Sequence, residues 1–211
     1  MDLETTVYTV GHSTHSIENF LNLLQGAGIT AIADVRSQPF SRFTPQFNRA
    51  ALADALRERN IAYVFVGKEL GARSDDLTCY ERGQVRYERL ARTAGFKVGL
   101  DRVMAGTRKF KVALMCAEKE PLECHRTLLV GRALHDQGVN VAHIHANGSI
   151  ESYDDAMSRL FDMTGVPRED LFLSAEELQK EALERQEQRV AYIDEKLAMD
   201  SFESIASITP A

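Results

Sequence analysis

Five short apolar runs recur along the chain, each ends in polar residues, and segments with helical spacing separate the runs. The runs are residues 7–10, 29–35, 62–66, 112–115 and 139–144. Runs of this length, rich in β-branched residues, are typical of buried strands. Their alternation with helices predicts an open α/β fold, with a mostly parallel sheet of about five strands and helices on both faces.

A helical extension is expected to follow this domain. We predict that the α/β domain spans residues 1–165 and that residues 166–211 form a helical extension and a mobile tail. Ser174 begins a capping-box pattern, and helix-favouring residues continue from it to Met199. The extension carries an apolar stripe formed by Val190, Ile193 and Leu197. This stripe either packs on the domain or provides a contact for a homodimer.

The composition excludes several classes of protein. The formal net charge of −6 argues against broad nucleic-acid binding, which needs a basic face. No apolar run approaches the roughly 20 residues of a membrane span. The three cysteines have no framework spacing, and the N-terminus has no signal-peptide pattern. We therefore expect a cytoplasmic protein with reduced thiols and no membrane partner.

Polar residues follow the predicted strands and should meet at one edge, because parallel strands end on the same side of a sheet. Guanidinium groups and the backbone N–H groups of a turn suit phosphate-like oxygens. The predicted anion-binding residues are Gly11, Ser13, Asp34, Arg36, Arg42, Lys68 and Arg126. The alternative for Arg36 is a structural ion pair with Asp34. The expected partner is an anionic small molecule or a nucleic-acid fragment.

Cys116 ends the fourth predicted strand, where a thiol can face a pocket and act as a nucleophile. The sequence from Pro121 to Gly138 predicts a helix, which would place Cys124 inside a helical turn. Cys116 is therefore the better nucleophile candidate. The residues expected to serve acid–base or orienting roles are His12, Glu118 and His125. A structural role and a metal-binding role for Cys116 remain open alternatives.

A metal site is the alternative for the same residues, and no cofactor is predicted otherwise. Zinc or iron would accept the ligands Cys116, Cys124 and His125, and His143 and His145 lie further along the chain. No pair of cysteines has the CxxC spacing of common zinc sites. If Cys124 and His125 were on a helix, they would point in different directions.

Three motifs make the chain resemble a known family. They are VGHSTHSIENFLNLLQGAGI, IADVRSQPFSRFTPQFN, and LMCAEKEPLECHR followed by HI. Together they resemble the family catalogued as "domain of unknown function 488", over about residues 7–150. The family pattern falls on Gly11, His12, Ser13, Asp34, Arg36, Pro39, Arg42, Pro45, Gln46, Phe47, Cys116, Glu118, Pro121, Cys124, His125 and Arg126. The resemblance implies a shared site but no reaction.

Three functions follow from these residues. The first is a cysteine-dependent hydrolase or transferase that acts on an anionic, phosphate-bearing substrate such as a nucleotide or nucleic-acid fragment. The second is a non-catalytic nucleotide-binding or nucleic-acid-binding module, in which the arginines and the aromatic residues Phe40, Phe43 and Phe47 bind the ligand. The third is a zinc or iron protein that uses the Cys/His residues.

Overall fold

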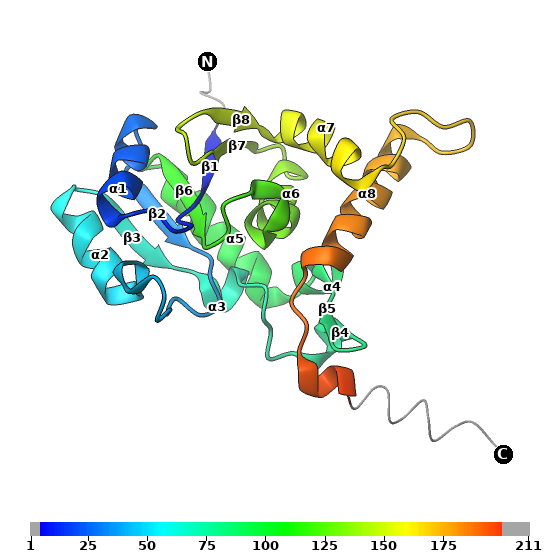
Figure 1. The fold of residues 1–211 in the computed structure, drawn as a ribbon, viewed down its shortest axis with the longest axis horizontal. Helices are drawn as coiled ribbons and strands as arrows, with labels where there is room; N and C mark the ends of the chain where they lie inside the picture. The colour runs from blue at the N-terminus through cyan, green and yellow to red at the C-terminus, as the bar shows by residue number, and fades with distance from the viewer. Residues whose placement is uncertain (1–4, 200–211) are drawn as a thin grey trace.

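The computed structural model describes residues 5–199, which form a six-stranded sheet in the order β3-β2-β6-β1-β7-β8 (Figure 1). The strands are β1 (Thr6–Gly11), β2 (Ala31–Asp34), β3 (Ala62–Phe65), β6 (Val112–Cys116), β7 (Asn140–Ile144) and β8 (Ile150–Ser152). The first five are mutually parallel, and β8 pairs with β7 in the antiparallel direction. The predicted α/β fold is confirmed, with β8 as an additional edge strand.

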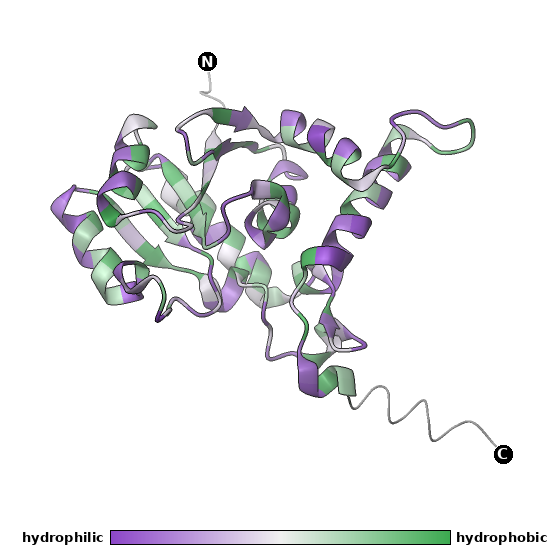
Figure 2. Cartoon of the chain, viewed as in Figure 1, coloured by the Kyte–Doolittle hydropathy of each residue, from purple (hydrophilic) through white to green (hydrophobic). Residues whose placement is uncertain are grey.

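Helices cover both faces of this sheet. They are α1 (Ile17–Gly26), α2 (Arg49–Glu58), α3 (Gly67–Leu70), α4 (Tyr87–Ala91), α5 (Ala94–Thr107), α6 (Arg132–His135), α7 (Tyr153–Thr164) and α8 (Ala175–Val190). The inner faces of α1 and α2 form one core with the sheet, and the other helices form the second. Figure 2 shows hydrophobic strands at the centre and hydrophilic outer faces on the helices.

Residues 72–109, which mix charged residues with scattered apolar ones, form a short hairpin and two helices. A hairpin of β4 (Tyr80–Glu81) and β5 (Gln84–Val85) precedes α4 and α5. Thr93 caps α5, because its hydroxyl accepts a hydrogen bond from the backbone N–H of Phe96. The two short strands and α4 place side chains from this segment near the end of β6.

The helix predicted from Pro121 to Gly138 begins later than expected. Pro121–Glu123 is a single 3₁₀ turn, and Cys124 has the extended dihedral angles φ −141° and ψ 139°. A π-helical segment, Arg126–Gly131, then leads into α6. The placement of Cys124 inside a helical turn was therefore wrong, and both Cys124 and its neighbour His125 precede the helix.

The C-terminal extension packs on the domain instead of standing apart. Helix α8 buries Leu178, Ala182 and Leu183, and it ends at Val190 although the helical pattern continues to Met199. The chain is extended around Ile193 because it pairs with the β4–β5 hairpin. Residues 200–211, which include the predicted mobile tail, lie outside the described residues. Within residues 5–199, no helix is both long and apolar enough to cross a bilayer.

Candidate functional site

A cavity of about 310 Å³ lies at the carboxyl edge of the sheet, where β2 and β6 end. The chain leaves β2 for α2 on one face and leaves β6 for α6 on the other, which is the arrangement that opens a ligand crevice in α/β sheets. The lining residues are Arg36, Ser37, Gln38, Ala72, Arg73, Tyr87, Cys116, Ala117, Glu118, Glu123, Cys124, His125, Val190 and Tyr192.

Cys116, Cys124 and His125 meet in this cavity. Their two Sγ atoms and one imidazole nitrogen all lie within 4.8 Å of one another. His125 Nδ1 is 3.7 Å from Cys116 Sγ and 3.9 Å from Cys124 Sγ. All three residues are buried. The extended backbone at Cys124 brings its thiol toward Cys116, an arrangement that a helical Cys124 would not give.

The hydrogen bonds of His125 fix which ring nitrogen faces the sulfurs. Its Nε2 lies 3.0 Å from the carbonyl oxygen of Val35, which only accepts, so Nε2 carries a hydrogen. Nδ1 is left to bind either a thiol hydrogen or a metal ion. The backbone N–H of Arg126 also donates to Cys124 Sγ, at 3.4 Å. Both contacts hold the cluster in place without a ligand.

The two thiols differ in acidity. Burial and the adjacent Cys124 raise the pKa of Cys116 well above its usual value. Burial also opposes ionisation of Cys124, but the hydrogen bond from Cys116 and the charges of Arg126 and His125 outweigh it and lower the pKa of Cys124. The pKa of His125 is raised, because Cys124 and Glu118 together outweigh burial. Cys124 is therefore the more thiolate-like sulfur, contrary to the preference for Cys116.

Glu118 completes the cluster on its solvent side. Its Oε2 is 3.0 Å from Cys124 Sγ, within hydrogen-bond distance. The residue is exposed, but its carboxyl group is screened from water at the sulfur, and this desolvation together with Cys124 raises the pKa of Glu118. Glu118 is thus placed to take up or release a proton at the cluster.

Arg36 and His12 belong to a buried network beside the cavity. Arg36 donates to both carboxylate oxygens of Asp34, at 2.9 and 2.7 Å, and to the carbonyl of Phe47. Its Nη1 donates to His12 Nε2 at 3.1 Å. Tyr63 donates to Asp34 as well. Arg36 therefore forms the structural ion pair with Asp34 that was the alternative to anion binding. One hydrogen on its Nη1 is not used in these contacts and is left for a ligand.

His12 does not line the cavity. Its Nδ1 donates to the carbonyl of Ser13 and its Nε2 accepts from Arg36, so both ring nitrogens are occupied. Burial, with Arg36 nearby, lowers the pKa of His12 to about 4 and keeps the ring neutral. The ring stacks on Phe47 at 4.2 Å. The geometry does not favour the predicted acid–base role of His12.

The predicted anion donors of the first turn are also occupied. The backbone N–H groups of His12 and Ser13 donate to the carbonyls of Cys116 and Ala117, which extends the pairing of β1 with β6. A side chain at Gly11 would meet the carbonyl oxygen of Glu118 at 1.8 Å. These residues hold the loop after β6 in contact with β1, and the N–H groups of His12 and Ser13 are used in that pairing.

The four cations expected to converge are separated in the structure. Arg126 is fully buried and donates to the carbonyls of Glu118 and Lys119 at 2.7 and 3.2 Å. Arg42 is exposed on the loop before α2 and lines no cavity described here. Lys68 lines a second cavity of about 510 Å³. Arg36 alone of the four reaches the cysteine cavity.

Sequence patterns gave no indication of Arg73, Tyr87 or Tyr192 as site residues. Arg73 and Tyr87 lie in the segment of mixed charge, and Tyr192 lies where a helix was expected. Burial and the charge of Cys124 raise the pKa of Tyr87. The hydroxyl group of Tyr87 therefore keeps its hydrogen and is a hydrogen-bond donor in the cavity wall. Tertiary contacts bring these residues to the cavity, including the pairing of the C-terminal extension with the hairpin, and such contacts leave no pattern in the sequence.

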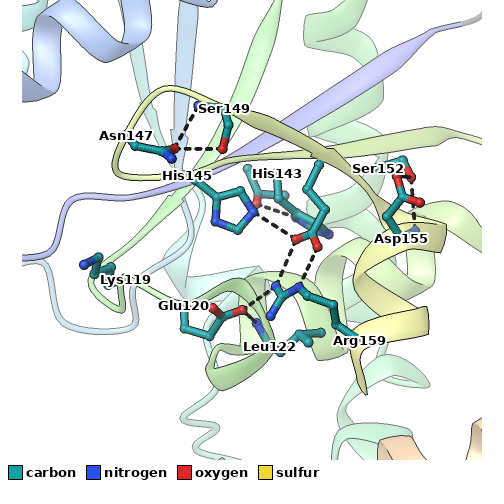
Figure 3. A network of polar contacts seen from close by, with 12 residues as sticks. Lys119, Glu120, Leu122, His143, His145, Asn147, Ser149, Ser152, Asp155 and Arg159 are labelled. Carbon is teal, nitrogen blue, oxygen red and sulfur yellow. Dashed lines mark hydrogen bonds and ion pairs between the residues drawn. The ribbon is translucent and has the colours of Figure 1, made fainter. Parts of the chain in front are cut away.

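His143 and His145, the other candidate ligands, lie in a separate polar network (Figure 3). His145 Nε2 is 2.9 Å from Glu151, which also pairs with Arg159, and Arg159 reaches Glu120. His143 is buried, and its Nδ1 is 2.8 Å from the hydroxyl of Thr9. Neither histidine joins the cysteines, so the metal-binding geometry is confined to Cys116, Cys124 and His125 among the residues that the structure describes.

Comparison with known proteins places this site in a family. Residues 16–133, more than half of the 211 residues, match the family described as "Domain of unknown function DUF488". The chain belongs to the DUF488 family. The resemblance seen in the sequence motifs is confirmed over this range. No curated protein and no solved structure matches the chain. In this DUF488 protein, the cysteine cluster lies inside the matched region, whereas Val190 and Tyr192 lie outside it.

Proposed function

We propose that this protein is a metal-dependent enzyme whose Zn²⁺ ion is held by Cys116, Cys124 and His125. The observation that carries the proposal is the mutual distance of the three ligand atoms. In a tetrahedral zinc site with Zn–S near 2.3 Å and Zn–N near 2.0 Å, sulfur and nitrogen ligands lie about 3.6 Å apart. The observed separations of 3.7 and 3.9 Å need little adjustment to reach this value.

The surroundings support a metal site. Imidazole ligands commonly donate their second N–H to a backbone carbonyl, as His125 does to Val35. Two thiolates would neutralise the charge of the ion in this buried position. Three protein ligands leave a fourth position for water or substrate, which is typical of catalytic zinc sites, and all three ligands line the cavity.

The reaction supported by this arrangement is hydrolytic. A zinc ion held by these three residues would supply a Lewis acid at the cavity. Glu118 would take a proton from the attacking water as its oxygen bonds to the electrophilic atom of the substrate, and would return that proton to the leaving group as the bond between the two breaks. Glu118 is within reach of the cluster, since its Oε2 lies 3.0 Å from Cys124 Sγ. No redox partner is needed for these steps.

A second candidate is the cysteine-dependent enzyme, with Cys124 as the nucleophile in place of Cys116. The backbone N–H of Arg126 on Cys124 Sγ and the lowered pKa of this thiol favour it. His125 Nδ1 would then stabilise the thiolate, and Glu118 would serve as the acid. An anionic, phosphate-bearing substrate remains a prediction for both candidates. The non-catalytic nucleotide-binding module has less support, because Phe40 and Phe43 are exposed and line no part of the cysteine cavity.

Metal analysis separates the two candidates. We expect about one zinc per chain in the purified protein, or after loading with zinc and dialysis, and loss of that zinc in Cys116→Ser, Cys124→Ser and His125→Asn. Cys79→Ser is the matched control, because Cys79 is a buried free cysteine outside the cluster. Circular dichroism checks that each variant is folded. Zinc that never exceeds trace amounts in the folded wild-type protein refutes the metal centre and leaves the thiolate candidate.

A further inference from the structure

Part of the cavity wall comes from the C-terminal extension. Val190 and Tyr192 line the cavity, although α8 ends at Val190 and both residues lie outside the family match. The backbone N–H of Val85 donates to the carbonyl of Tyr192 at 2.9 Å, and Gln84 pairs with Ile193. The extension thus adds a third strand-like segment to the hairpin and fixes the position of Tyr192.

Arg73 lies against this wall. Its guanidinium carbon is 4.3 Å from the ring centroid of Tyr192, a cation–π contact. Its backbone N–H donates to the hydroxyl of Ser37 at 3.0 Å. Arg73 lines both the cysteine cavity and the 510 Å³ cavity, which also share Ser37 and Gln38. Arg73 therefore stands where the two cavities meet.

The guanidinium of Arg73 has no carboxylate partner within residues 5–199. This distinguishes it from Arg36, whose charge is balanced by Asp34. The acidic residues that line the two cavities are Glu69, Asp75, Asp76, Glu118 and Glu123. Of these, Glu69 pairs with Arg102 and Glu118 contacts Cys124. A planar fork of unpaired donors, held on an aromatic ring at a cavity mouth, suits a carboxylate or phosphate.

We infer that Arg73 binds the anionic group of the substrate and that Tyr192 positions Arg73 for this contact. The substrate class is a molecule with a carboxylate or phosphate group at one end and the reacting group at the cysteine cluster. This inference rests on the proposed function, since it takes the cluster as the reacting centre. It assigns recognition of the anion to a residue held by the C-terminal extension, and not to Arg42, Lys68 or Arg126.

Protection of the cysteines measures this contact without a known substrate. The probe is phenyl phosphate, and the readout is the rate at which neutral iodoacetamide alkylates Cys116 and Cys124 at constant ionic strength. Cleavage after Lys and Arg places the three cysteines on separate peptides for mass spectrometry. The shift in thermal-unfolding midpoint with phenyl phosphate gives a second reading that needs no reactive thiol. Zinc content is measured in the same samples.

We expect phenyl phosphate to protect the wild-type protein and neutral phenol not to protect it. In Arg73→Gln the apparent Kd should rise by about tenfold or more, since a hydrogen bond to a charged group contributes about 1.5 kcal/mol or more. Tyr192→Leu should weaken protection and Tyr192→Phe should retain it, because the ring supplies the contact. The control is Arg57→Gln, which changes an exposed arginine on α2.

Equal protection of the wild-type protein and Arg73→Gln overturns the inference, as does absence of any phenyl phosphate effect in both readings. Equal protection by phenol overturns the assignment of an anion. The metal content distinguishes these failures from failure of the proposed function. A protein that binds phenyl phosphate through Arg73 but holds no zinc keeps the anion site and loses the metal centre. A protein that holds zinc but shows no phenyl phosphate effect keeps the metal centre and loses the anion site.

Discussion

Protonation of the buried His143 should destabilise the fold at acidic pH. The side chain is fully buried, and burial, with Arg126 nearby, lowers its pKa from 6.5 to about 4. A histidine whose pKa is lower in the folded state stabilises the protein above the pKa of the unfolded state. This contribution is lost as the pH falls from 6.5 to 4. The shift of about 2.5 pKa units is worth about 3 kcal/mol, of which about 2 kcal/mol is lost by pH 5.

The assay is urea unfolding followed by circular dichroism at pH 7.5 and pH 5, for the wild-type protein and His143→Asn. Asparagine keeps an acceptor for the hydroxyl of Thr9 but does not titrate in this range. The variant leaves a cavity, so its free energy of unfolding should be lower at both pH values. We expect that free energy to fall between the two pH values by about 2 kcal/mol less than in the wild-type protein.

The change in the free energy of unfolding between pH 7.5 and pH 5 is compared for the two proteins. This comparison cancels the contribution of every other titrating group that they share. His135→Asn is the control for the removal of a histidine from the chain, because His135 is half-exposed on α6. If His143→Asn and the wild-type protein lose the same free energy between pH 7.5 and pH 5, His143 is not held neutral by burial, and the reasoning is refuted.

Two further substitutions test the scaffold of the site. Gly11→Ala would place a β-carbon 1.8 Å from a backbone carbonyl oxygen, so we expect the free energy of unfolding in urea to fall by about 3 kcal/mol or more. Gly26→Ala, with open space around it, should be neutral or stabilising, and equal effects of the two substitutions would contradict the close packing at Gly11. Asp34→Asn leaves the buried charge of Arg36 without its partner and should lower the free energy of unfolding by about 3 kcal/mol or more. The matched control, Asp54→Asn in an exposed ion pair, should lower it by less than about 1 kcal/mol, and an equally small effect at Asp34 would show that the buried pair contributes little.

The sheet and the position of the site could be predicted because they depend on local patterns. Apolar runs of four to seven residues indicated the five parallel strands, and the rule for parallel strand ends placed Cys116 and Arg36 at one edge. The same rule could not predict which of these polar side chains bind other protein groups and which are available to a ligand. Asp34 and Arg36 satisfy one another, and Arg126 binds backbone carbonyls. Such pairing depends on distances that a strand order alone does not give.

The local structure at Cys124 could not be predicted from helix propensity. The sequence after Pro121 favours a helix, but the first turn is 3₁₀, and Glu120 accepts the backbone N–H of Leu122 at its start. Cys124 then becomes extended before the π-helical segment begins. This detail decides the chemistry, because it turns an adjacent cysteine and histidine toward the same point. Departures from regular helical geometry often occur at functional sites for this reason.

The two parts of the candidate site depend on different parts of the chain. The proposed metal ligands lie at the end of β6 and in the loop that follows, which Arg126 holds through the carbonyl of Glu118 and which packs on Gly11. These contacts are all within the protein, so they hold the loop in position for the cluster. The proposed anion contact of Arg73 depends instead on Tyr192, whose place is set by pairing with the β4–β5 hairpin. Tyr192→Leu should therefore weaken phenyl phosphate binding while the zinc content stays the same, because the contacts of Tyr192 described above are with Arg73 and the β4–β5 hairpin and not with Cys116, Cys124 or His125.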